Sequence, residues 1–301
     1  MKLRLLLIAW LLISPAWACF NLDEQDLQGH HVKNADPFDD PKYFFADSPD
    51  RWREDLREVE RRPINLETRN DRGVCLAHLG DVREALAIFQ QLEREAPGRY
   101  QNATNMGTCY ELAGDNQLAL DWIKEGIRRN PESHQGTEWL HQKILETKIR
   151  LARDPHWLES HSVLGYDFGP AEKPLLPAEL TSVTEQTRVR KALEYQLSER
   201  VPLVPAPDPI VGDLLFDLAN LRTLDSSVQR GQVWLKFSLT YRPPRLHLAR
   251  RRLAYLEKLA PAVSRRPAGP AQAPTSDPTK PALAVCGLLT LLLLNQRLLK
   301  L

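Results

Sequence analysis

Two groups of residues carry side chains that could do chemistry. His30 and His31 are followed by three potential carboxylate ligands, Asp36, Asp39 and Asp40. Their spacing matches no tight metal-ligand motif, and the segment KNADPFDDPKYF has the composition of a surface loop. We therefore predict no metal site and no bound cofactor.

Cys75 and His78 are three residues apart, a spacing that would place a thiol and an imidazole on neighbouring turns of one helix. A nucleophile needs an accessible thiolate, whereas a cysteine packed between helices stays protonated. The sequence contains no P-loop, no G-x-S-x-G, no H-E-x-x-H and no glycine-rich dinucleotide motif. We predict that the protein is not an enzyme.

A basic segment runs from Arg242 to Arg266, with eight Lys or Arg residues and one acid, Glu257. One interpretation is contact with anionic lipid headgroups. The other is a helix that docks on the folded domain through its leucines. The residues proposed for lipid contact are Arg245, Arg250, Arg251 and Arg252.

Composition limits the classes of function. The chain has 301 residues, of which 26% are charged and 43% hydrophobic, as expected for one or two helical units. The formal net charge of +1 indicates no general attraction to polyanions. We predict no nucleic-acid partner.

The amino-terminal residues resemble an export signal. Lys2 and Arg4 precede an apolar run from Leu5 to Ile13, and Ala16-Trp17-Ala18 supplies small residues at the cleavage positions. We predict a signal peptide over residues 1–18 and a mature amino-terminal segment over 19–65. A buried amino-terminal helix and a lipid-modified Cys19 are the alternatives.

The carboxyl end contains a candidate membrane anchor. The proline-rich residues 261–281 favour an extended stalk, because proline removes backbone hydrogen-bond donors. The apolar run over 282–299 is short for a bilayer, but Arg297 and Lys300 can extend towards the surface. We expect an exported protein on the extracytoplasmic side of a membrane (periplasmic if bacterial), anchored by this segment. A buried helix and a removable sorting tail remain open.

The middle of the chain is repetitive. Five pairs of residues are each 34 positions apart: Gly73 and Gly107, Cys75 and Cys109, Gly80 and Gly114, Ala85 and Ala119, and Pro97 and Pro131. At these positions the sequence resembles the tetratricopeptide repeat, a helix-turn-helix unit of this length. The resemblance covers residues 66–133, about two repeats. The repeats are degenerate, because Arg69, Ala103 and Leu92 depart from the usual pattern.

The resemblance implies an all-α fold in which antiparallel helix pairs stack into a solenoid. Gly73 and Gly107 would allow close crossing of the second helix, and Gly80 and Gly114 would end the first helix with positive φ. A further amphipathic helix after Pro131 is expected to close the array, which gives a repeat domain over 66–153.

Residues 154–178 lack clear periodicity and are predicted to form an ordered loop packed on the array. Residues 179–260 are predicted to be helical, with a possible diverged repeat. Cys75 and Cys109 are predicted to be buried free thiols, because neighbouring first helices pack too far apart for a disulfide.

In the family that the repeats resemble, the first helices line a groove that holds a polypeptide. The basic clamp of some members is missing, because Asn70 and Val74 occupy its positions, so a basic or neutral polar segment is favoured. The predicted groove residues are Glu67, Asn70, Val74, Ala77, His78, Gln101, Thr104, Thr108, Glu111 and Leu112.

The combined prediction is a non-enzymatic, membrane-tethered, extracytoplasmic scaffold that mediates protein–protein interaction. One alternative is an envelope assembly factor that acts through its basic carboxy-terminal helices. An envelope hydrolase is a further alternative, which lacks a recognisable catalytic motif.

Overall fold

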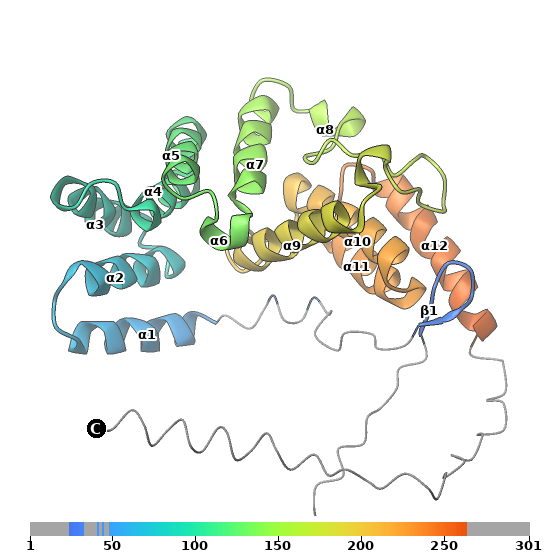
Figure 1. Cartoon of the computed structure of the whole chain (residues 1–301), viewed down its shortest axis with the longest axis horizontal. Helices are drawn as coiled ribbons and strands as arrows, with labels where there is room; N and C mark the ends of the chain where they lie inside the picture. Colours follow the sequence, from blue (N-terminus) through green and yellow to red (C-terminus); the bar gives the residue numbers. More distant parts are fainter. Residues whose placement is uncertain (1–23, 33–40, 42–43, 45–47, 264–301) are drawn as a thin grey trace, which may run out of the picture. The chain divides into compact units, whose positions relative to one another are not determined.

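Figure 1 shows the computed structural model of the chain, which describes residues 24–32, 41, 44 and 48–263. The chain divides into two units, residues 1–265 and 266–301, and all the described residues lie in the first. The predicted signal (1–18), most of the predicted stalk (261–281) and the candidate span (282–299) therefore lie outside the described residues, as do Asp36, Asp39 and Asp40.

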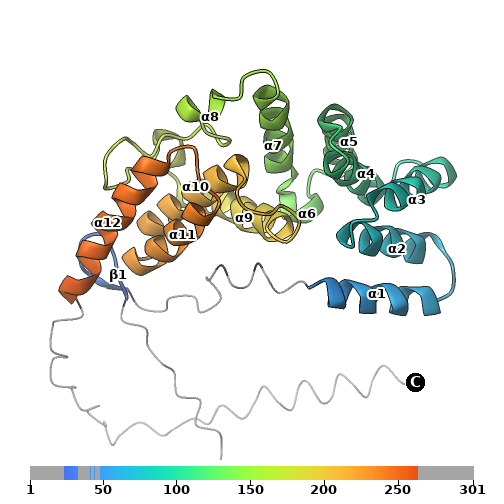
Figure 2. The same ribbon diagram turned by 180° about the vertical axis from the view of Figure 1, so that it is seen from behind.

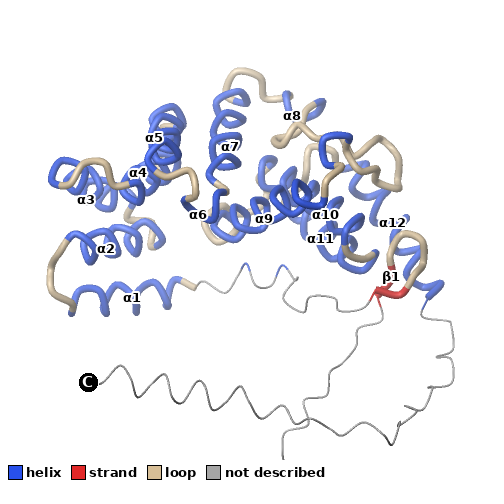
Figure 3. The backbone as a smooth tube through the Cα atoms, in the orientation of Figure 1, coloured by secondary structure: helices blue, strands red, loops and turns tan. Residues whose placement is uncertain are grey.

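The described chain is mostly helical (Figure 3), which confirms the all-α prediction. The two strands, β1 (Glu24–Gln25) and β2 (His31–Val32), form an antiparallel hairpin. The helices are α1 (Pro49–Arg61), α2 (Leu66–His78), α3 (Val82–Glu95), α4 (Tyr100–Leu112), α5 (Asn116–Arg129), α6 (Ser133–Gly136), α7 (Glu138–Leu151), α8 (Trp157–Ser160), the 3₁₀ helix η2 (Ala178–Leu180), α9 (Val183–Arg200), α10 (Pro209–Asp225), α11 (Val228–Thr240) and α12 (Leu246–Val263).

Local sequence signals set where several helices begin. The Asn65 side chain accepts a hydrogen bond from the Thr68 backbone N–H at 2.9 Å, and Thr68 Oγ1 accepts one from Asn65 N, which forms a capping box at α2. Asp115 accepts a hydrogen bond from the Leu118 backbone N–H at the start of α5, and Asp208 accepts one from Val211 N–H at the start of α10. Asp81 makes no side-chain cap at α3.

The 34-residue spacing corresponds to a repeated geometry. Gly80 and Gly114 have φ of +91° and +88° and occupy the bends between α2 and α3 and between α4 and α5. A Cβ added at Gly73 would lie 2.7 Å from the ring of Phe89, and one at Gly107 would lie 2.7 Å from Ile123. Both glycines therefore permit the close helix crossing that the sequence predicted.

Consecutive long helices pack on one another from α1 through α5 to α7, and from α7 through α9 to α12 (Figures 1 and 2). Helix α7 packs on α5 at the end of the second repeat, the position expected for the closing helix, but its other face is covered as well. Leu140 and Ile144 of α7 are fully buried in the same core as Leu193 of α9 and Leu214 of α10. Helix α7 therefore joins the repeats to the carboxy-terminal helices.

The amino-terminal segment contains helix α1, which the sequence analysis did not predict. Helix α1 packs on α2 and therefore covers the outer side of the first repeat. The hairpin packs on α11, where Glu24 accepts a hydrogen bond from Ser227 Oγ at 2.6 Å and pairs with Arg230 at 3.1 Å.

Residues 154–178 were predicted to pack on the repeat array. Leu164 and Phe168 are instead buried in the core that α7 shares with the carboxy-terminal helices. Helix α12 continues to Val263, so the predicted stalk cannot begin at Pro261. No helix among the described residues combines the length and apolar character needed to cross a bilayer.

Candidate functional site

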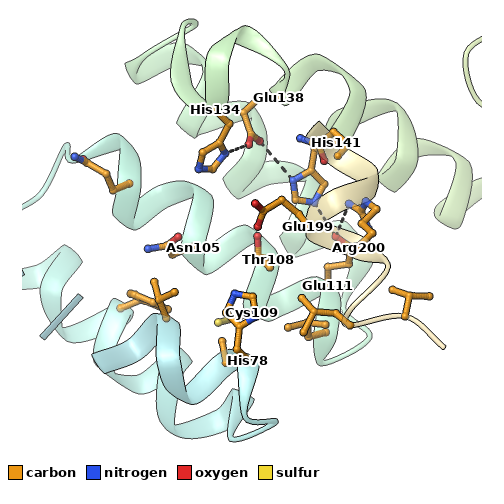
Figure 4. A pocket seen from close by; sticks show the side chains of 18 of the residues that line it. His78, Asn105, Thr108, Cys109, Glu111, His134, Glu138, His141, Glu199 and Arg200 are labelled. Carbon is orange, nitrogen blue, oxygen red and sulfur yellow. Dashed lines mark hydrogen bonds and ion pairs between the residues drawn. The ribbon is translucent and has the colours of Figure 1, made fainter. Parts of the chain in front are cut away.

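A pocket of about 350 Å³ lies on the side of the repeats formed by the first helix of each pair. Its walls come mainly from α2, α4, α6 and α7, and from the end of α9 with the turn that follows it (Figure 4). This volume is at the lower end of the range for ligand-binding pockets.

Eight of the ten predicted groove residues line this pocket: Asn70, Val74, Ala77, His78, Gln101, Thr108, Glu111 and Leu112. The other two do not. Thr104 is fully buried against Gly126, so its prediction is wrong. The Glu67 carboxylate lies outside the pocket and pairs with Arg99 at 2.9 Å.

Glu111 forms the charged floor of the pocket. Its carboxylate accepts hydrogen bonds from Arg200 Nη1 at 2.6 Å and His141 Nε2 at 2.7 Å, and it pairs with Lys148 Nζ at 2.7 Å. Glu111 is 8% exposed. It therefore cannot offer a free carboxylate to a basic partner, which corrects the role that the sequence predicted.

His141 lies between two carboxylates. Its Nδ1 is 3.5 Å from Glu138 Oε2, and Glu138 Oε1 is hydrogen-bonded to His134 Nδ1. Figure 4 shows that Glu138, His141, Glu111 and Arg200 form one continuous series. Because these residues belong to α7, α4 and α9, the series fixes the three helices relative to one another.

The pKa values of these groups reflect the pairing. Burial favours the neutral form of Glu111, but Arg200 and His141 outweigh burial and hold its pKa well below the usual range. Burial likewise opposes ionisation of Glu138, yet hydrogen bonds from His134 and His141 lower its pKa to about 2. Burial and Arg200 oppose the charge of His141, but Glu111 and Glu138 prevail and raise its pKa.

His134 adopts an uncommon backbone conformation at the pocket edge. Its φ is +49°, and Gln135 follows with φ +59°. A non-glycine residue in this left-handed region costs about 1–2 kcal/mol, which the surrounding contacts must offset. The conformation allows His134 to reach Glu138 and to stack on Tyr195, with ring centroids 5.6 Å apart.

Glu138 and His141 have the Glu-x-x-His spacing found in some carboxylate metal sites. In the part of the chain that the structure describes, no three ligand side chains are grouped so that they could hold a metal ion. Lys148 and Arg200 supply the positive charge beside Glu111. His30 instead bonds Asp26 at 2.9 Å.

The two cysteines of the repeats lie where the sequence predicted. Cys75 and Cys109 are buried and free, as predicted; Cys19 and Cys286 lie outside the described residues. Burial raises the pKa of Cys109 to about 12 and also raises that of Cys75. His78 stacks on Trp52 with ring centroids 3.7 Å apart. A protonated thiol of this kind is a poor nucleophile.

No protein-family model matches the chain, and no curated protein is significantly similar to it.

The site contains residues that the sequence analysis missed, among them His134, Glu138, His141, Lys148 and Arg200. Glu138, His141 and Lys148 recur at spacings of three and seven, which places them on one side of α7, but other polar residues of this helix obscure that pattern in the sequence. Arg200 is 89 residues from Glu111, and no local pattern indicates that contact.

Two of the four proposed lipid-contacting residues, Arg245 and Arg252, bond to groups within the protein, which corrects their assignment. Arg252 is 1% exposed and donates to Asn220 Oδ1 at 2.6 Å and to the Phe168 carbonyl at 2.8 Å. Arg245 donates to Asp213 and Asp217 at 2.7 and 2.9 Å. Arg251 pairs with Glu172 at 3.4 Å. Arg250 is exposed and keeps its predicted role as a candidate.

Proposed function

We propose that this chain is a non-enzymatic helical-repeat scaffold, similar to tetratricopeptide-repeat proteins, that holds a segment of another polypeptide in its pocket. The observation that carries the proposal is the placement of eight predicted groove residues, from two successive repeats, around one open pocket. A rigid concave surface built from helices is well suited to hold an extended segment or a helix.

The repeat geometry supports the family resemblance. Gly73 faces Phe89 and Gly107 faces Ile123 at matching distances, and the bends at Gly80 and Gly114 correspond. Both features follow from the 34-residue period. Shared packing at equivalent positions is what a stacked array of repeats requires.

Binding is favoured over catalysis by the chemistry of the lining. Lys148 and Arg200 are both paired with Glu111, and Glu138 is paired with His134 and His141. The pocket-lining thiol of Cys109 has a pKa of about 12. These groups stabilise the pocket walls and leave the polar and apolar residues of α2 and α4 to face a partner.

The proposal includes export and tethering. The signal over 1–18 and the apolar segment over 282–299 are the sequence features that support it. The alternative, an assembly factor acting through the basic carboxy-terminal helices, is weakened because Arg245 and Arg252 bond within the protein.

Site-specific crosslinking in intact cells tests the scaffold. A photoreactive amino acid at Leu112, in the pocket, is expected to give one predominant protein adduct. The same group at Leu118, which is 41% exposed on α5 outside the pocket, is the matched control and should not give that adduct. Equal adducts at both positions would contradict binding in the pocket.

A further inference from the structure

The two permanent cations that line the pocket are both committed to one carboxylate. Arg200 Nη1 bonds Glu111 at 2.6 Å, and Lys148 Nζ pairs with the same carboxylate at 2.7 Å. An acidic partner would reach these cations only by displacing Glu111, which would leave a buried carboxylate without its counter-charges. Neither cation is therefore available to an acidic segment.

The other carboxylates of the pocket are engaged within the chain. Glu138 is 2% exposed and is paired with His134 and with His141, whose raised pKa favours the positively charged imidazole. Glu199 also takes part in an interaction within the chain, and it is exposed, so water screens its charge. A basic segment would gain little from either carboxylate.

The pocket also has an apolar part. Val74 and Ala77 of α2 line it together with Leu112 of α4. The turn that follows α9 contributes Leu203 and Val204. Because burial of apolar surface is the favourable contribution that such side chains make to binding, a complementary segment brings an apolar side chain.

One hydrogen bond between side-chain amides joins the two repeats within the pocket lining. Asn105 Nδ2 of α4 donates to Asn70 Oδ1 of α2 at 2.9 Å (Asn105 is labelled in Figure 4). Within the described chain, Asn70 Nδ2 and Asn105 Oδ1 make no further hydrogen bond. The pair therefore presents one donor and one acceptor side by side, whichever of the two amides donates to the other.

An extended polypeptide offers the complementary groups. In a strand, the N–H and C=O of one residue point to the same side, as in the residue pairs of an antiparallel sheet. Such a residue can accept from Asn70 Nδ2 while its own N–H donates to Asn105 Oδ1. A helical segment lacks these free groups, because its N–H and C=O bond one another. The amide pair therefore favours an extended segment over a helix.

We propose that the bound polypeptide is an uncharged, extended segment, held through its main chain by the amides of Asn70 and Asn105. An apolar side chain of the segment packs against Val74, Ala77 and Leu112. This inference depends on the proposed scaffold function, and it names the chemistry and the conformation of what the scaffold holds. Of the basic and neutral segments that the sequence favoured, the paired charges leave the neutral one.

A phage-displayed library of short random peptides, selected on the full chain, tests the chemistry of the segment. Selected peptides are expected to share an apolar residue at one position and no charged residue. A synthetic peptide with lysine or aspartate at that position should bind at least about tenfold more weakly, because its charge would be desolvated without a partner. Peptides that share a Lys, Arg, Asp or Glu would overturn this inference and leave the scaffold standing.

Ester substitution in the selected peptide tests the main-chain contact without altering the protein. Each N–H of the peptide is replaced in turn by an ester oxygen, which removes one donor. At one position the ester should weaken binding to the wild type by about two- to tenfold, the range for one hydrogen bond. For Asn105→Ala, the amide and ester forms at that position should bind equally, because the acceptor is gone.

Gln117→Ala is the matched control, because Gln117 carries an exposed side-chain amide on α5 outside the pocket; it should keep the wild-type difference between amide and ester. Circular dichroism of each variant checks that the fold is intact. Esters that bind the wild type as tightly as the amide at every position would overturn the main-chain contact and leave the scaffold standing. The same difference persisting in Asn105→Ala would do so too. Failure to select any peptide would overturn both proposals.

Discussion

Glu111 shows how burial changes the meaning of a charged residue. From the sequence it resembled a groove acid available to a partner, yet its carboxylate is enclosed by Arg200, His141 and Lys148. A buried carboxylate with three cationic partners contributes to the fold. Replacing it by lysine would test folding, not recognition.

Removing this carboxylate should therefore destabilise the protein. Glu111→Gln leaves Arg200 and Lys148 without their counter-charge, and breaking a buried ion pair from one side typically costs about 3–5 kcal/mol. Urea unfolding followed by circular dichroism measures the change in the free energy of unfolding. The exposed Glu67→Gln should change it much less. Equal free energies of unfolding for the two variants would show that the ion pairs of Glu111 do not stabilise the protein.

His141 should make stability depend on pH. Its folded pKa is raised, so its contribution is complete below about pH 6.5, the unfolded value, and is lost as pH rises through the folded pKa. The pKa values of Glu111 and Glu138 are lowered, so their contributions are present above about pH 4.3 and are lost as pH falls through the folded values. Glu111, Glu138 and His141 together therefore stabilise the protein most between about pH 4.3 and about pH 6.5.

The measurement is the free energy of unfolding from about pH 6 to about pH 8, compared between the wild type and His141→Gln. The wild type should lose more stability over this range. Asp217, whose pKa burial and Asp213 raise to about 7, affects both proteins equally, so the difference reports His141. Parallel curves would exclude a contribution from His141.

At the scale of elements, the packing of each repeat depends on one close crossing. Gly73→Ala would place a methyl group 2.7 Å from the Phe89 ring, and overpacking of this kind costs about 1–3 kcal/mol, more than the gain of about 1 kcal/mol in helix propensity. We expect a net loss of stability by thermal unfolding. The double variant Gly73→Ala, Phe89→Leu should recover part of it. A stabilised Gly73→Ala would refute the close crossing.

The sequence predicted the helices of the repeats better than the contacts that these helices make with the rest of the chain. The 34-residue period located α2 to α5 and the bends at Gly80 and Gly114, because repeat packing depends on local spacing. The packing of α7 on the carboxy-terminal helices was missed, since burial of Leu140 and Ile144 against α9 and α10 depends on contacts distant in sequence. The pocket floor was missed for the same reason, because Arg200 reaches Glu111 only through the fold.

Thr104 illustrates a different error. Its position in the repeat indicated a groove residue, but Gly126 in the next helix leaves space that the Thr104 side chain fills. In the first repeat, the residue that corresponds to Gly126 is Leu92, so the two repeats pack differently there. In degenerate repeats the side chains of each unit differ, so the position in the repeat alone does not determine which side chains face the groove.

At the scale of the whole molecule, the proposed tether makes a simple prediction. Deleting residues 282–301 should move the protein from the membrane fraction to the soluble fraction, because the chain would lose its apolar anchor. Fractionation followed by immunoblotting measures this. A deleted chain that stays with the membrane would contradict anchoring by this segment.

The central claim is that a polypeptide segment occupies the pocket between the repeats and α9. Its most direct test uses a synthetic peptide chosen from a phage-displayed random library by its binding to the full chain. The affinity of this peptide is measured for the wild type and for Ala77→Trp, whose indole ring would fill the pocket from α2. The account predicts a loss of at least about tenfold, with no change for Leu118→Trp on the outer face of α5. Unchanged affinity of the Ala77→Trp variant would contradict the claim.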